Sequence, residues 1–86
     1  MPRRVLTLRK VDPPRATHVR LWTERPIALD GTRLVHVAGP WRIGGEWWTP
    51  RSFARDYYDV ETTAGHLLRV YRATPEDTWW VDGIYD

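Results

Sequence analysis

Few side chains in this sequence could take part in covalent or metal chemistry. His18, His36 and His66 do not have the spacing of zinc ligands, and the chain contains no cysteine to complete such a set. Ser52 is the only serine, and it lacks the flanking glycines of a hydrolase nucleophile. The glycine pair 44–45 has no following lysine and no helix to supply amides, as a phosphate-binding loop would. We therefore expect no metal and no cofactor.

The clustered carboxylates do not indicate acid–base catalysis either. Asp56, Asp59 and Glu61 lie in a predicted strand, where Asp59 and Glu61 alternate onto the same outer face. Solvated charges are typical of that face, because only the other face of such a strand is buried. The sequence therefore predicts a protein that is not an enzyme and has no catalytic residues.

Aromatic rings are the most prominent feature of the chain, and nine of its eleven lie between residues 41 and 80. Each Trp or Tyr buries roughly 150–250 Å², so most of them should form the core. Exposed Trp and Tyr rings serve as protein–protein hot spots and as stacking platforms for single-stranded nucleic acids. Adjacent strand residues point to opposite faces, so one of two neighbouring tryptophans is expected to be exposed. The candidate partner-binding residues are Trp47, Trp48, Tyr57 and Trp22.

The charge is unevenly distributed, although the formal net charge is only +2. Residues 1–25 hold seven basic and two acidic groups, whereas residues 74–86 hold four acids and no base. Such a basic segment favours a polar partner. The chain has no Asn or Gln, the usual adenine readers, so sequence-specific DNA recognition is not expected. The candidate nucleic-acid contacts are Arg3, Arg4, Arg9, Lys10 and Arg15.

Apolar and polar residues alternate over short segments that are separated by Gly, Pro and Asp, a pattern typical of strands and turns. Pro26 should end the first segment, Asp30–Gly31 should form a hairpin, and Gly39–Pro40 should end the next strand. The predicted strands are 17–22, 34–38, 55–62, 67–72 and 79–82, with 41–43 as a further short segment. We expect an all-β fold, a small antiparallel barrel or roll of about five to six short strands.

Two regions are distinguished within the chain. Residues 1–15 form a basic arm, either flexible or a short edge strand, because Pro13 and Pro14 should prevent the strand from continuing. Residues 16–86 form a single β domain, in which Tyr58, Val60, Leu68 and Val70 are expected to share the buried face of one hairpin.

The sequence favours a cytoplasmic protein without membrane contact. No apolar stretch approaches the ~20 residues of a membrane span. The arginine-containing start also lacks the apolar core of a signal peptide.

An ordered set of motifs over about residues 16–86 resembles a known family. These are Gly-Pro-Trp-Arg-Ile at 39–43, Gly-Glu-Trp-Trp at 45–48, Ala-Arg-Asp-Tyr-Tyr-Asp-Val-Glu-Thr at 54–62, Trp-Trp at 79–80 and Gly-Ile-Tyr at 83–85. They are similar to the C-terminal domain of ImuB, the catalytically inactive Y-family polymerase homologue of the bacterial mutasome. A small family of standalone domains shares the GEWW…RDYY…WY pattern.

The resemblance implies a part in error-prone translesion DNA synthesis or damage tolerance. In that setting the domain is a non-catalytic adaptor, and its partners are other DNA-repair or mutasome proteins. The alternative that the residues leave open is sequence-tolerant binding of single-stranded nucleic acid through the basic arm and exposed rings. The two functions differ in whether the partner contacts the aromatic body or the arm.

Overall fold

A computed structural model describes residues 6–44 and 54–86, and these residues form an all-β fold. These described residues contain seven strands, one or two more than the sequence predicts. Their bounds are β1 (Leu8–Thr17), β2 (Val19–Trp22), β3 (Arg25–Leu29), β4 (Thr32–Gly44), β5 (Ala54–Thr62), β6 (Leu67–Thr74) and β7 (Thr78–Tyr85).

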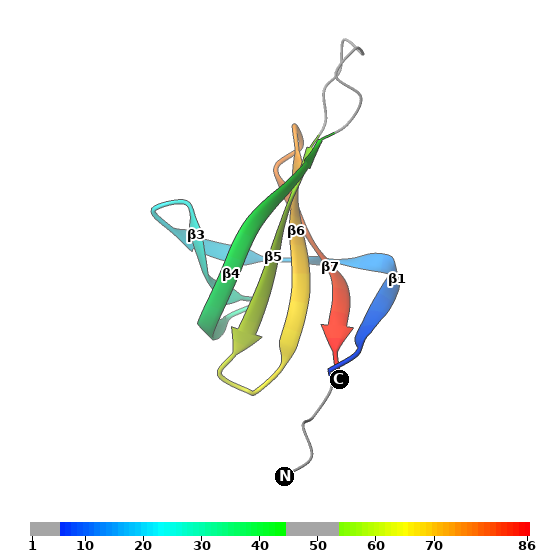
Figure 1. The fold of residues 1–86 in the computed structure, drawn as a ribbon. Coiled ribbons are helices and arrows are strands. Elements are labelled where there is room, and N and C mark those ends of the chain that lie inside the picture. Colours follow the sequence, from blue (N-terminus) through cyan, green and yellow to red (C-terminus); the bar gives the residue numbers. More distant parts are fainter. Residues whose placement is uncertain (1–5, 45–53) are drawn as a thin grey trace.

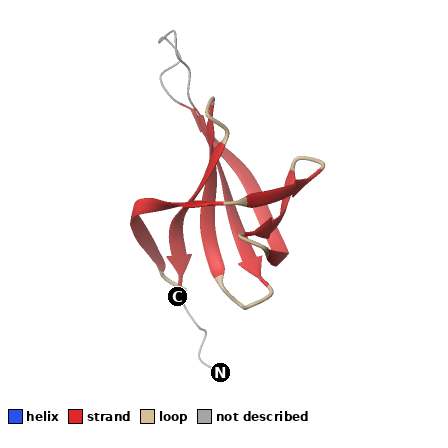
Figure 2. Cartoon of the chain, turned by 180° about the vertical axis from the view of Figure 1, so that it is seen from behind, coloured by secondary structure: helices blue, strands red, loops and turns tan. Residues whose placement is uncertain are grey.

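The strands form one antiparallel sheet in the order β1-β7-β6-β5-β4-β3-β2. β1 and β2 therefore occupy the two edges, yet only His18 separates them in the chain. Figures 1 and 2 show this segment crossing one side of the curved sheet from edge to edge. Because β1 and β2 run end to end, they do not pair, and the sheet is a roll that is not closed by hydrogen bonds.

Asp30 forms hydrogen bonds that stabilise the corner at His18, where β1 ends and β2 begins. Its carboxylate accepts hydrogen bonds from Thr17 Oγ1 at 2.7 Å and from the His18 N–H at 2.8 Å. The Asp30 N–H in turn donates to the His18 carbonyl at 2.7 Å. The hydrogen bond from the His18 backbone, followed by that from Thr17, lowers the pKa of Asp30. Asp30 and Gly31 both have positive φ, so the expected hairpin turn also holds the corner.

The core lies on the face of the sheet that the β1–β2 segment covers. Tyr58 pairs with Val70 and Val60 pairs with Leu68, and all four side chains are buried. This confirms the predicted shared face of the β5–β6 hairpin. The core cluster also contains Trp79, whose ring centroid lies 5.4 Å from that of Tyr58, together with Leu29 and Val81.

Prolines do not end strands where the sequence predicted that they would. β1 continues through Pro13 and Pro14, which lie in a register shift between Lys10 and Arg15. Residues in a bulge need not donate to the ladder, so a missing N–H is tolerated there. The predicted boundary between residues 15 and 16 thus falls within β1, and residues 8–15 belong to an edge strand of the sheet.

The predicted end of a strand at Gly39–Pro40 was also wrong, because β4 runs on to Gly44. The chain accommodates the pair by a register shift between Ala38 and Trp41. Gly39 has a φ of 116°, and a Cβ built on it would lie 2.6 Å from the Tyr57 carbonyl oxygen. Only glycine fits this close approach of two backbones.

The predicted strand 17–22 is divided at His18, and it does not end at Pro26. β2 turns into β3 through Thr23 and Glu24, which have φ of 48° and 66°. Pro26 is fully buried within β3. This hairpin was missed because neither turn residue is one of those that favour positive φ.

Candidate functional site

Four aromatic residues form a row across the face of the sheet opposite the core. Trp41 pairs with Tyr57, Tyr57 with Tyr71, and Tyr71 with Trp80, so the row crosses β4, β5, β6 and β7. The Tyr57 and Tyr71 rings are tilted, with centroids 5.3 Å apart. Tyr57 precedes the core residue Tyr58, so it points to the other face. We call these four residues the aromatic row.

The aromatic row is accessible chiefly at its β4 end. Tyr71 in the middle is only 5% exposed, although it does not belong to the core cluster. Tyr57 and Trp80 are half-buried. Trp41 is 47% exposed, and Ile43, two residues further along the same face of β4, is 60% exposed. A partner would therefore meet the row at Trp41.

Arg55 lies over the aromatic row. Its guanidinium carbon is 4.6 Å from the centroid of the Tyr71 ring, which is the geometry of a cation–π contact. Arg55 Nη1 also donates to the Tyr57 hydroxyl at 3.3 Å, and this hydrogen bond raises the pKa of Arg55. Burial raises the pKa of the Tyr71 hydroxyl. Arg55 thus remains charged and orders both tyrosine rings.

A second polar group, which borders the aromatic row, is linked by hydrogen bonds. Arg69 Nε donates to Asp59 Oδ1 at 3.1 Å, and Arg69 Nη2 donates to the Tyr85 hydroxyl at 2.7 Å. The Tyr85 hydroxyl donates to the same Asp59 oxygen at 3.0 Å. The hydrogen bond to Asp59 raises the pKa of Arg69. The charges of Asp59 and Arg69 therefore compensate each other.

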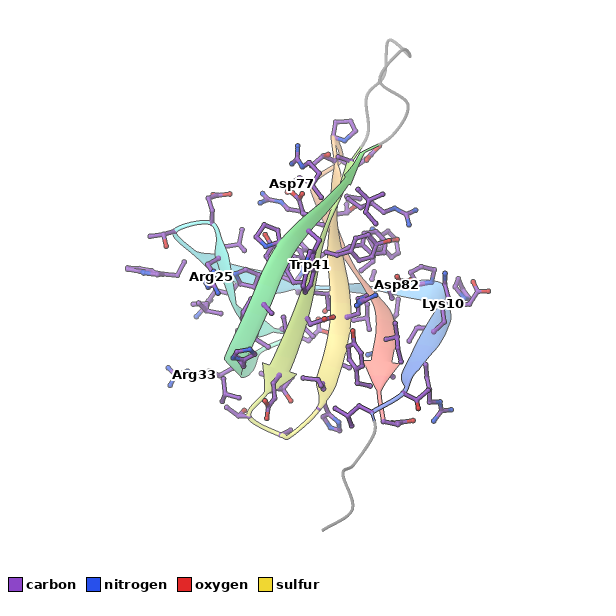
Figure 3. The ribbon with its side chains drawn as sticks, viewed as in Figure 1. Lys10, Arg25, Arg33, Trp41, Asp77 and Asp82 are labelled. Atoms are coloured by element: carbon purple, nitrogen blue, oxygen red, sulfur yellow. The ribbon has the colours of Figure 1, made fainter. Side chains whose placement is uncertain are left out.

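The exposed end of the row borders a hollow of about 410 Å³, lined by Trp41, Ile43, Tyr57, Arg69 and Asp82. Figure 3 shows Trp41 on β4 and Asp82 beside β7. The lining provides apolar surface from Trp41, Ile43 and Tyr57, together with one base, Arg69, and one acid, Asp82. Such a hollow can hold a side chain of a partner.

The predicted partner-binding residues are only partly brought together. Tyr57 belongs to the aromatic row and also lines the hollow. Trp22 is 70% exposed at the end of β2 and pairs with Arg25 in a different hairpin. Trp47 and Trp48 lie outside the described residues. Trp41, Trp80 and Arg55 were missed as site residues, because their common face depends on the register of four strands.

The predicted nucleic-acid contacts are divided as well. Arg3 and Arg4 lie outside the described residues. Arg9 Nη1 forms an ion pair with Asp86 Oδ2 at 2.6 Å, and this contact raises the pKa of Arg9. Lys10 and Arg15 are exposed on either side of the β1 bulge. The acidic end of the chain thus neutralises part of the basic segment.

Other chemistry is not apparent in residues 6–44 and 54–86. His18 lies at the β1–β2 corner, His36 on β4 and His66 in the β5–β6 turn, and no three His, Asp or Glu side chains there gather as metal ligands. The same residues contain no helix that is long and apolar enough to cross a membrane.

Comparisons with protein-family models, with curated proteins and with solved structures found no match to this chain.

Proposed function

We propose that this chain is a non-catalytic protein-interaction module that binds its partner through the Trp41 end of the aromatic row. The observation that supports this best is the register of Trp41, Tyr57, Tyr71 and Trp80 on one face of four adjacent strands. Trp, Tyr and Arg are the residues most enriched in protein–protein hot spots. A rigid sheet presents them with little loss of conformational entropy on binding.

The charge of this face favours a protein over a nucleic acid. Arg69 is paired with Asp59, and Arg55 shares its surroundings with Asp82, whose charge contributes to the raised pKa of Arg55. The face is thus close to neutral. Proteins that bind single strands combine stacking rings with a positively charged groove. The aromatic row lacks that excess of positive charge.

The resemblance to the ImuB C-terminal domain extends the proposal to a biological setting. In this setting the module is an adaptor in error-prone translesion DNA synthesis or damage tolerance in the bacterial cytoplasm. Its partners are other mutasome or repair proteins. Where a RecA-like protein and a second replicative polymerase are encoded beside the gene of this chain, these two proteins are the first partners to test.

The test measures binding of the purified chain to each of these two proteins by biolayer interferometry. Trp41→Ala is compared with Trp22→Ala, because both tryptophans are exposed but only Trp41 lies in the aromatic row. We expect Trp41→Ala to weaken binding at least tenfold, which corresponds to about 1.4 kcal/mol. Trp22→Ala should leave affinity within about twofold of the parent.

Two results would contradict the proposal. The first is an absence of binding between the parent chain and either protein. The second is an equal effect of the two substitutions, which would remove the special role of the aromatic row. Circular dichroism melts of both variants establish that each remains folded.

A further inference from the structure

Among residues 6–44 and 54–86, no strand pairs with one edge of β4 over most of its length. β3 pairs with β4 only through Ala28 with Arg33 and Leu29 with Thr32. Beyond Arg33, no other strand of the described residues lies on that side, whereas β5 pairs with β4 as far as Gly44. Figure 1 shows the upper part of β4 with β5 on one side and no labelled strand on the other. An unpaired edge of this kind is a template for another strand.

The hydrogen bonds of β5 identify which groups of β4 face the open edge. The Ala54 carbonyl accepts from Thr74 Oγ1 of β6 at 3.1 Å, so Ala54 is directed away from β4. Backbone groups alternate in direction along a strand, so the N–H and C=O groups of Asp56, two residues further on, also point away from β4. On β4, Gly44 pairs with Ala54 and Arg42 pairs with Asp56. Because these two pairs exchange no backbone hydrogen bonds, the N–H and C=O groups of Gly44 and Arg42 point away from β5, to the open edge. These groups are available to an added strand.

The open edge belongs to the basic part of the sheet. β2, β3 and β4 contain Arg20, Arg25, Arg33 and Arg42 and no acidic residue. The two acids of the connecting turns are engaged: Glu24 pairs with Arg72, and Asp30 holds the β1–β2 corner. Figure 3 shows Arg25 and Arg33 on the β3–β4 side of the molecule, opposite Lys10. Arg42 is already paired with Asp56 of β5, so the attraction for an acidic ligand comes from Arg20, Arg25 and Arg33.

The bulge limits the length of edge that is available. Pro40 cannot donate a hydrogen bond, and the register shift between Ala38 and Trp41 bends the strand there. Val37, before the bulge, already has its carbonyl bonded to Arg25 Nη2 at 2.9 Å. Strand addition is thus confined to Trp41–Gly44, next to the hollow.

We infer that an acidic, extended segment of a partner protein adds to β4 along Trp41–Gly44 as a further antiparallel or parallel strand. Its backbone would pair with Arg42 and Gly44, and an apolar side chain would enter the hollow beside Trp41 and Ile43. Its acidic side chains would be attracted by Arg25 of β3 and Arg33 of β4, because Arg42 is already paired with Asp56. This inference rests on the proposed function, and it names the class of partner and its mode of binding.

The pattern of donors and acceptors distinguishes a peptide from a nucleic acid at this edge. A strand edge presents both N–H and C=O groups, and a peptide backbone satisfies both. A phosphate backbone offers acceptors alone, so the outward carbonyls of Arg42 and Gly44 would stay without donors. Charge by itself would permit either ligand, but the open edge favours the peptide.

The test uses labelled eight-residue peptides with the free protein, which does not require the natural partner. The probe alternates acidic and aliphatic residues (Asp-Val-Glu-Ile, twice). One control replaces each acid by lysine, and another carries N-methyl groups at alternate amides. We expect the acidic probe to bind in fluorescence anisotropy with a Kd below about 100 μM, tighter than non-specific DNA binding. Both control peptides should bind at least tenfold more weakly.

Comparison of Arg42→Pro with Arg42→Ala separates the contribution of the Arg42 backbone N–H to peptide binding from that of its side chain. Both substitutions remove the ion pair of Arg42 with Asp56, which measures 2.8 Å. Only proline also removes the outward N–H, and proline is tolerated at an edge. We expect Arg42→Pro to bind the acidic probe at least tenfold more weakly than Arg42→Ala does. Amide exchange by NMR should show the Arg42 and Gly44 N–H groups unprotected in the free protein and protected with the probe.

Several outcomes would overturn this inference. They are equal binding of the acidic and lysine peptides, equal affinity of the two Arg42 variants, and slow exchange of the Arg42 amide in the free protein. Tighter binding of an oligo(dT) strand than of the acidic probe, or self-association of the chain that Arg42→Pro abolishes, would do so as well. If the mutasome proteins bind in a Trp41-dependent manner while Arg42→Pro has no effect, the proposed function stands and strand addition fails.

Discussion

Trp41 faces Tyr57 across β4 and β5 only because the chain changes register between Ala38 and Trp41. Ala38 pairs with Asp59, whereas Trp41 pairs with Tyr57, so β4 contains one extra residue over this interval. Without it, Trp41 would stand opposite Asp56 and point to the other face, because side chains alternate along a strand. The bulge at Gly39–Pro40 therefore places the exposed ring in the aromatic row.

Gly39→Ala should destabilise the fold. The substitution puts a Cβ 2.6 Å from the Tyr57 carbonyl oxygen and forces a non-glycine residue to a φ of 116°. We expect a loss of roughly 1–3 kcal/mol in the free energy of unfolding, measured in urea. Gly44→Ala is the matched control, because a Cβ at that position would meet nothing within 4 Å. Equal stability of the two variants would contradict the role assigned to the bulge.

Tyr58→Ala should be the more costly of two neighbouring tyrosine substitutions. Tyr58 is 5% exposed in the core against Trp79, and its removal leaves a cavity. We expect a loss of about 3–5 kcal/mol for Tyr58→Ala, and of less for Tyr57→Ala on the outer face. Urea melts of both variants provide the measurement. A loss below about 1 kcal/mol for Tyr58→Ala would mean that the two faces are assigned the wrong way round.

Asp30 should make the stability of the protein depend on pH in the acidic range. The folded state lowers its pKa, chiefly through the His18 backbone hydrogen bond. Its contribution is therefore present above the pKa of the unfolded chain, near 3.9, and is lost as the pH falls through the lower folded value. Asp30→Asn should flatten this part of the profile. Thermal melts of the parent and the variant between about pH 2 and 6 test this prediction. If the stability of both proteins fell equally with pH, the result would argue against the contacts of Asp30 at the corner.

Single-stranded DNA should bind weakly and through Lys10 and Arg15. Both are exposed on β1, whereas Arg9 is paired with Asp86. We expect a Kd no tighter than about 100 μM at low salt, the level of non-specific binding. Replacing both residues by alanine should reduce the salt slope by about 1.4, at roughly 0.7 counterions per contact. Fluorescence anisotropy with oligo(dT) is the measurement. Tight binding that both substitutions abolish would favour the nucleic-acid alternative over the adaptor.

The resemblance to the ImuB C-terminal domain came from ordered local motifs, and it supplies the setting of the proposed function. It did not supply the site. Tyr57 was predicted as a contact residue, and the structure places it in the aromatic row. Trp22 was predicted as well, and the structure shows it exposed but on another hairpin. Local alternation indicates which side of a strand a residue occupies and contains no information about its neighbours on other strands.

The sequence by itself determined the all-β class, the Asp30–Gly31 hairpin and the buried face shared by Tyr58, Val60, Leu68 and Val70. Each of these depends on period-2 alternation or on turn chemistry within a few residues. The tertiary structure decided what depends on pairing between distant segments. In the structure, β1 and β4 continue through their prolines, because residues in a bulge need not donate a backbone hydrogen bond. The same pairing between strands aligns Trp41, Tyr57, Tyr71 and Trp80. Register between strands is set by packing of the whole sheet, so no local pattern could have placed those four rings together.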